Sequence, residues 1–289
     1  MGNYSIVSND TSILGESPIW DEIFQRIYWV DIESKKLHAW SFVHNKKLEW
    51  NFSNRICSIS LTTSHEELLC AFDKFFAYFN VITKKITKLK NQVELPDNVR
   101  FNDGKTDGFG RFWCGTMSES NPSRPDGAIY LLDNDLNIHI IIKGIHISNS
   151  ITTSPDNKYI YYADTVKKKI YKTNLSEDIS NIKAASIFID KTSLEGFPDG
   201  STVDINGYLW NAEWNGGQVS SYDLSGKLLN TIKTPMQRPT CCAFGGKNMN
   251  TLFITSALEK ENEEDNLSGK TISISTDTVG NFSNRFFIK

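Results

Sequence analysis

Hydrophobic and polar positions along the chain repeat as short strands separated by turns. Residues 197–223 contain one copy of this pattern, with three runs rich in β-branched and aromatic residues at 202–203, 208–210 and 219–222. The runs are separated by Asp204-Ile205-Asn206-Gly207 and Asn215-Gly216-Gly217. Turns of these compositions are typical of β-hairpins. The stretch therefore predicts a meander of three antiparallel strands.

The same pattern occurs six times along the chain. The second strands align at 27–31, 67–71, 111–115, 159–163, 208–212 and 251–255, and their starts lie 40 to 49 residues apart. A third strand follows each of them, at 36–40, 75–79, 128–132, 169–173, 218–222 and 271–275. Sequential strands repeated at this spacing are typical of a β-propeller, with one four-stranded sheet per blade. The sequence predicts an all-β, six-bladed β-propeller; the alternative is two stacked sandwiches with an accidental repeat.

A short strand at residues 4–7 precedes the first repeat. We expect it to pair with the last blade and close the propeller, because closure removes exposed strand edges. A closed propeller cannot be divided between blades without exposing such edges, so residues 1–289 predict a single domain. The charged run at 259–266 is expected to form a surface loop.

Composition narrows the class of protein. A hydrophobic content of 39% with 12% aromatic residues allows a sizeable core, and a net charge of −3 without a basic patch disfavours nucleic-acid binding. No run approaches the roughly 18 apolar residues that a membrane span requires. The five cysteines show no C-x-x-C spacing and suit a reducing compartment. We expect a soluble, cytoplasmic protein without nucleic-acid or membrane partners; the oligomeric state stays open.

The repeat also predicts which residues surround the opening of the propeller. Residues that precede the second strand at the same register in every blade line one mouth. Counting back 10 to 12 residues from the second-strand hydrophobic residues gives six register positions, which are Glu16, Ser58, Asn102, Asn149, Asp199 and Thr240. Glu, Asp and Asn oxygens together suit a hard cation such as Ca²⁺, Mg²⁺ or Mn²⁺. The alternative is that these are ordinary turn residues, which does not account for Glu16.

Other catalytic machinery is not indicated. None of the histidines falls on this register, which disfavours a histidine-bound zinc or a catalytic histidine. The run Gly15-Glu16-Ser17-Pro18-Ile19 lacks the last glycine of a nucleophile elbow. No Lys or Arg falls on this register, although Arg100 lies two residues before Asn102.

The chain resembles the SMP-30/gluconolactonase/luciferin-regenerating family, to which regucalcin belongs. The resemblance covers nearly the whole length. Its motifs are Leu14-Gly15-Glu16-Ser17-Pro18-Ile19-Trp20, Tyr28-Trp29-Val30-Asp31-Ile32, Arg100-Phe101-Asn102-Asp103-Gly104-Lys105, Arg111-Phe112-Trp113-Cys114-Gly115-Thr116-Met117, Asn149 with Ser154-Pro155-Asp156, Pro198-Asp199-Gly200, and Pro239-Thr240-Cys241-Cys242-Ala243-Phe244-Gly245-Gly246. Together these motifs are highly specific for the family.

This resemblance implies a function and a site. It implies a six-bladed propeller that holds one divalent metal ion through Glu16, Asn149 and Asp199. Calcium is the expected ion, with Zn²⁺, Mn²⁺ or Mg²⁺ as alternatives. The resemblance further implies that Arg100 and Asn102 contact a sugar-lactone substrate and that Asp199 doubles as the general base for its hydrolysis.

The sequence departs from the family pattern at two places. Regucalcin-like members carry a substrate-contacting glutamate three residues after the Gly-Thr-Met motif, where this chain has Ser120 with Glu119 as its neighbour. The common Asn-Gly pair of the fourth blade is Asn149-Ser150 here, which retains the metal ligand.

Three hypotheses follow for the function. The first is a metal-dependent lactonase. The second is a non-enzymatic calcium-binding or scaffold propeller of the regucalcin type, although a scaffold does not require acidic side chains gathered at one mouth. The third retains the site but changes the reaction, for example to phosphotriester or thioester hydrolysis.

Overall fold

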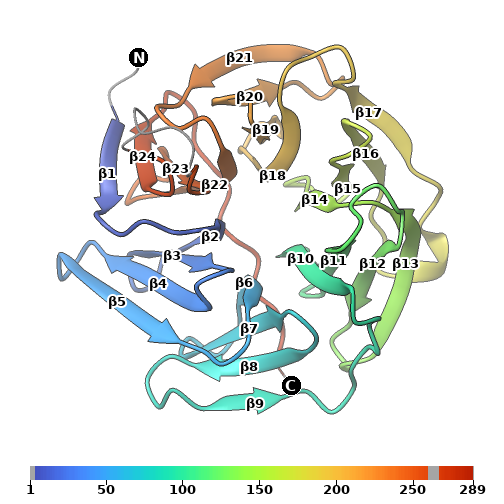
Figure 1. Cartoon of the computed structure of the whole chain (residues 1–289), viewed down its shortest axis with the longest axis horizontal. Helices are drawn as coiled ribbons and strands as arrows, with labels where there is room; N and C mark the ends of the chain where they lie inside the picture. Colours follow the sequence, from blue (N-terminus) through green and yellow to red (C-terminus); the bar gives the residue numbers. More distant parts are fainter. Residues whose placement is uncertain (1–3, 260–266, 289) are drawn as a thin grey trace. The chain divides into compact units, whose positions relative to one another are not determined.

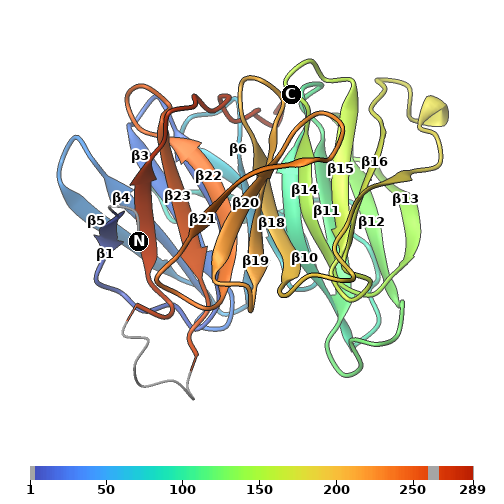
Figure 2. The ribbon, with the colours of Figure 1, turned by 90° about the horizontal axis from the view of Figure 1, so that it is seen from above.

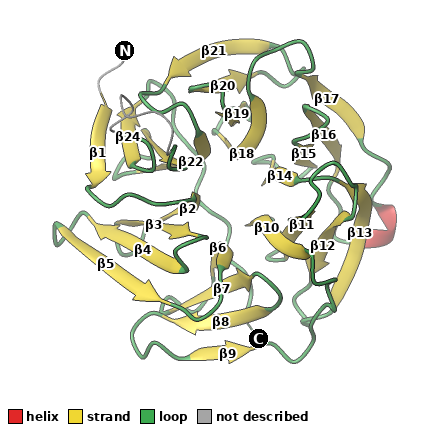
Figure 3. Ribbon diagram, viewed as in Figure 1, coloured by secondary structure: helices red, strands yellow, loops and turns green. Residues whose placement is uncertain are grey.

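The computed structural model describes residues 4–259 and 267–288, and these residues form short antiparallel strands joined by tight turns (Figure 1). Within these ranges the strands make six sheets of four strands each. Figure 3 shows strands and loops throughout, with the 3-10 helix η1 (Ile179–Asn181) as a short exception. The fold is the predicted six-bladed β-propeller, and the alternative of stacked sandwiches is wrong. We number the blades in chain order.

Contacts group the chain into two compact units, each with three blades. Unit 1 comprises Met1–Arg55 and Ser193–Phe282, and unit 2 comprises Ile56–Thr192 and Ser283–Lys289. The prediction of a single domain over residues 1–289 stays a prediction. Residues 260–266 of the expected charged loop lie outside the described residues.

Unit 1 holds blades 1, 5 and 6. Blade 1 consists of β2 (Gly15–Asp21), β3 (Arg26–Asp31), β4 (Lys36–Ser41) and β5 (Lys46–Asn51). Blade 5 consists of β18 (Phe197–Val203), β19 (Leu209–Trp214), β20 (Gln218–Tyr222) and β21 (Leu228–Lys233). Blade 6 consists of β22 (Pro239–Gly245), β23 (Thr251–Ser256), β24 (Thr271–Ser275) and β1 (Tyr4–Ser8).

Unit 2 holds blades 2, 3 and 4. Blade 2 consists of β6 (Ile56–Leu61), β7 (Glu67–Phe72), β8 (Phe76–Asn80) and β9 (Ile86–Lys88). Blade 3 consists of β10 (Val99–Thr106), β11 (Phe112–Ser118), β12 (Gly127–Leu132) and β13 (Ile138–Ile145). Blade 4 consists of β14 (Ser148–Thr153), β15 (Tyr159–Asp164), β16 (Lys169–Asn174) and β17 (Ser186–Asp190).

Burial falls from the first to the last strand of a blade. Every residue of β2, β6 and β22 is buried, whereas β9 is exposed throughout and β17 and β21 are largely exposed. Figure 2 shows the strands of blades 3 and 4 along their length, with β13 in the outermost position of blade 3. The first strands therefore lie in a buried setting, and this is where the register positions occur.

Aromatic rings pack between neighbouring blades inside each unit. In unit 1, Trp20 of blade 1 stacks on Phe253 of blade 6, with ring centroids 5.6 Å apart. In unit 2, Phe76 of blade 2 packs on Phe101 of blade 3, with centroids 4.4 Å apart. Such contacts add to the hydrophobic stabilisation of rings that bury a large apolar area. The first strands are held by these rings as well as by backbone hydrogen bonds.

The N-terminal strand completes the last blade, as the sequence predicts. β1 pairs antiparallel with β24, with Tyr4 opposite Ile274 and Ile6 opposite Ile272. Figure 1 shows β1 beside β24. Val7 is buried in the apolar cluster that also contains Ile272 and Ile274. The pairing therefore covers the hydrogen-bonding edge of β24 and adds Val7 to this apolar cluster. In the described ranges no helix is long and apolar enough to cross a membrane.

Deletion of residues 1–9 is expected to destabilise the protein and to promote association. The deletion removes the partner of β24 and exposes an unpaired strand edge. Loss of the buried Val7 side chain alone is worth about 1.5–3 kcal/mol. Thermal unfolding and light scattering after size-exclusion chromatography measure both effects, with deletion of residues 1–3 as the control. A shortened protein that stays monomeric with an unchanged melting temperature would contradict this role of β1.

Candidate functional site

A β-bulge occurs in the first strand of every blade, at or beside the register position. The shifts in strand pairing lie between Glu16 and Ile19, Ile56 and Ser58, Phe101 and Gly104, Asn149 and Thr152, Pro198 and Ser201, and Pro239 and Cys241. A bulge bends the strand and changes the direction in which a side chain points. The repeated register of the sequence thus corresponds to a repeated distortion of the backbone.

In unit 2 the bulges of blades 3 and 4 bring three predicted site residues together. The Asn102 Nδ2 atom donates a hydrogen bond to Asn149 Oδ1 at 2.9 Å and another to the Ser148 carbonyl at 2.9 Å. Arg100 Nη1 donates to Asn102 Oδ1 at 2.8 Å. All three side chains are buried. Arg100, Asn102 and Asn149 therefore form one hydrogen-bonded group, in which Arg100 supplies a positive charge.

Glu119 joins this group through Arg100. One of its carboxylate oxygens, Oε1, lies 3.5 Å from Arg100 Nε, and its backbone N–H donates to the Asn98 carbonyl at 2.8 Å. Of the two neighbours Glu119 and Ser120, it is therefore Glu119 whose carboxylate lies beside Arg100, a predicted substrate-contacting residue. The family departure at Ser120 thus leaves an acidic side chain at this end of blade 3.

Asp103 connects the bulges of blades 3 and 4. Its Oδ2 atom accepts a hydrogen bond from the Ile151 backbone N–H at 2.8 Å. Burial raises the pKa of the Asp103 carboxyl above its usual value, while nearby Lys105 and the backbone N–H groups of Ile151 and Gly104 act in the opposite direction. The residue was not among the predicted site residues, and its role is to fix the backbone that carries Asn149.

Two serines near the predicted metal ligands adopt a backbone conformation that suits glycine. Ser150, which follows Asn149, has a φ angle of 57°, and Ser17, which follows Glu16, has a φ angle of 49°. A positive φ is unfavourable for a residue with a Cβ atom, and such strain often occurs at functional sites. The substitution of serine for the family's usual glycine at position 150 therefore preserves the conformation at the expense of some strain.

In unit 1, Glu16 and Asp199 lie in bulges of blades 1 and 5. Their exposed fractions are 8% and 6%, so both carboxyl groups are buried. The Oε2 atom of Glu16 accepts a hydrogen bond from the Ser17 backbone N–H at 2.9 Å. The fully buried Asn211 donates from Nδ2 to the Asp199 carbonyl and to Ser201 Oγ, each at 3.1 Å. Asn211 therefore fixes the backbone at Asp199.

Gly200 allows blade 6 to pack directly against the Asp199 bulge. A Cβ atom at position 200 would lie 2.2 Å from the Cys241 Sγ atom and 2.8 Å from the Cys241 Cα atom. Real Cβ atoms do not approach other atoms so closely. The glycine of the Pro-Asp-Gly motif is thus required for packing against Cys241, while Asp199 of the same motif supplies the carboxylate.

The two remaining register positions have structural partners. The Thr240 hydroxyl donates to the Gly15 carbonyl and lies 2.9 Å from Thr255 Oγ1. Ser58 Oγ lies 3.7 Å from Cys114 Sγ. Burial raises the pKa of the Cys114 thiol well above its ordinary value, so the thiol stays protonated and is a poor nucleophile at neutral pH. Neither position brings a charged group to the site.

Sequence reasoning missed the residues that hold the predicted ones in place. Thr165 Oγ1 accepts a hydrogen bond from Asn149 Nδ2 at 2.9 Å, and it directly follows Asp164 at the end of β15. In the structure Asp31 and Asp164 occupy equivalent places at the ends of β3 and β15, whereas the sequence alignment of the second strands stopped one residue short, at Ala163. Glu119 and Asp103 lie next to quoted motif residues, but their contacts depend on the folded backbone.

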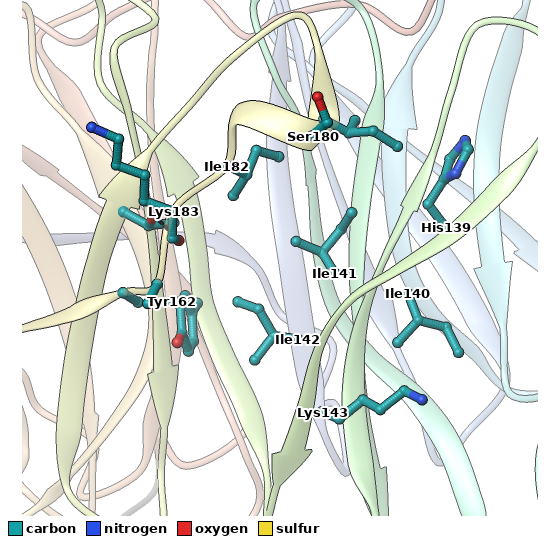
Figure 4. Close-up of a pocket in the computed structure, with 13 residues that line it drawn as sticks. His139, Ile140, Ile141, Ile142, Lys143, Tyr162, Ser180, Ile182 and Lys183 are labelled. Atoms are coloured by element: carbon teal, nitrogen blue, oxygen red, sulfur yellow. Dashed lines mark hydrogen bonds between the residues drawn. The ribbon is translucent and has the colours of Figure 1, made fainter.

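A groove elsewhere in unit 2 lacks the chemistry of the predicted site. It has a volume of about 710 Å³ and lies between β13 and the segment around η1. Figure 4 shows Ile141, Ile142 and Ile182 around its centre, with Lys143 and Lys183 toward its margins. None of the predicted site residues lines this groove. The bulged first strands, rather than this groove, carry the predicted site residues.

Comparisons with known proteins agree with the motifs. A sequence model of the family described as "SMP-30/Gluconolactonase/LRE-like region" matches residues 14–258. Regucalcin from Danio rerio is 33% identical over 87% of this chain and 85% of its own length. Pentonolactonase XacC from Haloferax volcanii is 31% identical over 86% of this chain and 83% of its own length.

A solved structure is also similar over nearly the whole chain. Regucalcin from Agrobacterium tumefaciens, described as a calcium-binding protein, superposes with a TM-score of 0.91 at 26% sequence identity, covering 99% of this chain and 97% of its own. The match thus extends beyond individual motifs to all six blades. The chain belongs to the SMP-30/gluconolactonase/LRE-like family.

Proposed function

We propose that this protein is a divalent-metal-dependent hydrolase that opens a sugar lactone. The observation that carries the proposal is the buried Arg100–Asn102–Asn149 group, which combines a cation with two amides at the bulges of neighbouring blades. Relatives named as lactonases, such as the pentonolactonase XacC, support a lactone as the substrate. A purely structural site has no need for this buried combination of polar groups, since each is costly to bury.

The residues present fit a hard divalent cation. Glu16 and Asp199 provide two buried carboxylates, and Asn149 provides an amide oxygen. Buried carboxylates are costly unless a cation or hydrogen bonds offset their charge. An all-oxygen donor set favours Ca²⁺, with Mn²⁺ and Mg²⁺ as alternatives. Zn²⁺ is a further alternative, although it more often takes nitrogen or sulfur ligands.

Each protein residue has a distinct part in the proposed reaction. Glu16, Asn149 and Asp199 would hold a divalent cation, which would supply Lewis-acid stabilisation of the negative charge that develops on the lactone carbonyl oxygen. Arg100 and Asn102 hydrogen-bond the hydroxyl groups of the sugar and orient it. Asp199 accepts the proton of the attacking water, the bond between the acyl carbon and the ring oxygen breaks, and the ring oxygen takes up that proton as a hydroxyl.

A non-enzymatic calcium-binding protein is the second candidate function. The relatives named regucalcin and the solved structure described as calcium-binding favour it. This candidate accounts for Glu16, Asn149 and Asp199 but assigns no role to Arg100. Activity against a panel of lactones, measured by acid release after chelation and re-addition of Ca²⁺, Mn²⁺, Mg²⁺ or Zn²⁺, separates the two candidates.

A cytoplasmic location and a small-molecule partner complete the proposal. All five cysteines are free and buried, which suits a reducing compartment. The net charge of −3 and the absence of a basic patch in the sequence give no support to a nucleic-acid partner.

Asp199→Asn is expected to reduce turnover far more than metal binding. The variant keeps an oxygen ligand but cannot accept a proton, so kcat should fall by about 10²-fold or more. Calorimetry measures the metal affinity and a pH-stat measures lactone hydrolysis on the same preparation. Asp199→Ala serves as a comparison, since loss of the ligand and the base together should reduce both quantities. Parent-like turnover of Asp199→Asn at saturating metal would exclude Asp199 as the base.

Arg100→Ala is expected to reduce kcat/KM while changing metal affinity little. A lost hydrogen bond to a charged group is worth ~1.5–3 kcal/mol, which corresponds to about 10- to 150-fold. The effect should be larger on a polyol lactone than on an unsubstituted one, because Arg100 acts on the hydroxyl groups. Arg100→Lys retains the charge but not the planar donor geometry, and it should recover part of the activity. Equal activity of the alanine variant and the parent across the panel would favour the binding-protein candidate.

A further inference from the structure

The amide of Asn149 is held at both of its ends. Its Oδ1 atom accepts from Asn102 Nδ2 at 2.9 Å, and its Nδ2 atom donates to Thr165 Oγ1 at 2.9 Å. An amide has one oxygen that can bind a cation and one nitrogen that cannot. Which end faces the site therefore decides whether Asn149 can act as a ligand. The Thr165 hydroxyl is the contact that fixes the nitrogen end.

Thr165 begins a tight turn that is tied to the start of β14. Its backbone N–H donates to the Ile147 carbonyl at 3.0 Å, and the Lys168 N–H donates to the Thr165 carbonyl at 3.0 Å. Lys168 has a positive φ of 52°, which closes the turn. The position of the Thr165 side chain relative to Asn149 is thus set by backbone hydrogen bonds.

A buried carboxylate holds both sides of this turn. Asp164 is almost fully buried, and its Oδ2 atom lies 2.8 Å from His146 Nδ1 and accepts from the His146 backbone N–H at 3.4 Å. Lys167 Nζ lies 3.4 Å from the same oxygen. Since His146 precedes β14 and Asp164 ends β15, the carboxylate connects the segment before Asn149 to the turn that contains Thr165.

Blade 1 has the same backbone frame with a different residue at the equivalent of Thr165. Asp31 accepts from the Ile13 N–H at 2.9 Å and the Leu14 N–H at 3.1 Å, and the Ile32 N–H donates to the Leu14 carbonyl at 3.0 Å. Ile32 therefore occupies the place of Thr165 without a hydroxyl. The turn itself does not require one.

The two blades differ in the ligand that this position adjoins. Blade 1 carries Glu16, whose two carboxylate oxygens are chemically equivalent, whereas blade 4 carries an amide with unlike ends. The orientation of the side chain matters only for the amide, whose nitrogen end needs an acceptor such as the Thr165 hydroxyl. In blade 4, where the orientation of the Asn149 amide matters, this position carries the hydroxyl of Thr165. In blade 1, where the orientation of the Glu16 carboxylate does not matter, the same position carries the apolar side chain of Ile32.

We infer that Thr165 is a positioning residue, which accepts a hydrogen bond from Asn149 Nδ2 and thereby presents Asn149 Oδ1 to a bound divalent cation. The Asp164 carboxylate holds the turn that places Thr165. This inference rests on the proposed function for the role of Asn149 as a ligand. Neighbouring groups of this kind fix the orientation of metal-binding side chains in many proteins.

The test is the Ca²⁺ affinity of Thr165→Val, measured by calorimetry on the full chain. Valine has the shape of threonine without the acceptor, so Ca²⁺ affinity should fall by about 10- to 100-fold. Thr165→Ser should restore most of the affinity. Thr152→Val, in the same strand as Asn149, is the matched control and should bind like the parent. If Thr165→Val does not fold, Thr165→Ala carries the same expectation.

A second background separates positioning from a general loss of stability. Asn149→Asp makes both ends of the side chain oxygen, so Thr165→Val should weaken Ca²⁺ binding in the parent and have little effect in the Asn149→Asp background. An equal loss in both backgrounds, or parent-like affinity of Thr165→Val, overturns the inference.

The proposed metal site has its own control. Asn149→Ala should weaken Ca²⁺ binding whatever Thr165 does. If Asn149→Ala binds Ca²⁺ like the parent, the assignment of Asn149 as a ligand is wrong, and the inference about Thr165 fails with it. If Asn149→Ala binds weakly while Thr165→Val binds like the parent, the metal site stands and only the positioning role is wrong.

Discussion

A polar group buried in protein must be hydrogen-bonded, and the first strands of the blades are built around this requirement. An unsatisfied buried group costs about 1–3 kcal/mol, and each bulge breaks the regular ladder of backbone hydrogen bonds. Nearby side chains supply substitutes. Glu16 accepts from the Ser17 N–H, Asp103 accepts from the Ile151 N–H, and Asn211 donates to the Asp199 carbonyl. The same strands can therefore be bulged and buried, which allows polar side chains to be presented from a tightly packed interior.

The blades were predictable because their signals are local. Strand alternation, hairpin turns and a spacing of 40 to 49 residues identified the ends of the second and third strands to within three residues, and pairing of the N-terminal strand followed from the need to cover an edge. The register positions followed from the same spacing, and three of the predicted site residues, Arg100, Asn102 and Asn149, are hydrogen-bonded to one another. A repeat defines equivalent positions even where the residues at those positions differ.

What the sequence could not predict depends on contacts between distant segments and on backbone geometry. The positive φ angles of Ser17 and Ser150 occur without the glycine that usually signals them. The contact between Arg100 and Glu119 joins the start of one strand to the end of the next. The register also included Ser58 and Thr240, whose hydroxyls have structural partners. The repeat thus identifies candidate site residues by their equivalent positions in the blades. The local hydrogen bonds then show which of these residues have a structural role.

The pairing of β1 with β24 has a consequence for how the protein is made. Among the described strands β24 comes last in the chain, so blade 6 stays incomplete until β24 has been made. Contacts between segments this far apart in sequence form slowly, because the segments must find each other at a cost in chain entropy. During that interval the newly made chain carries an uncovered edge on one sheet, the period in which association with other chains is most probable. The pairing of β1 with β24 therefore protects the folded protein against association through the β24 edge, but it forms only after β24 has been made.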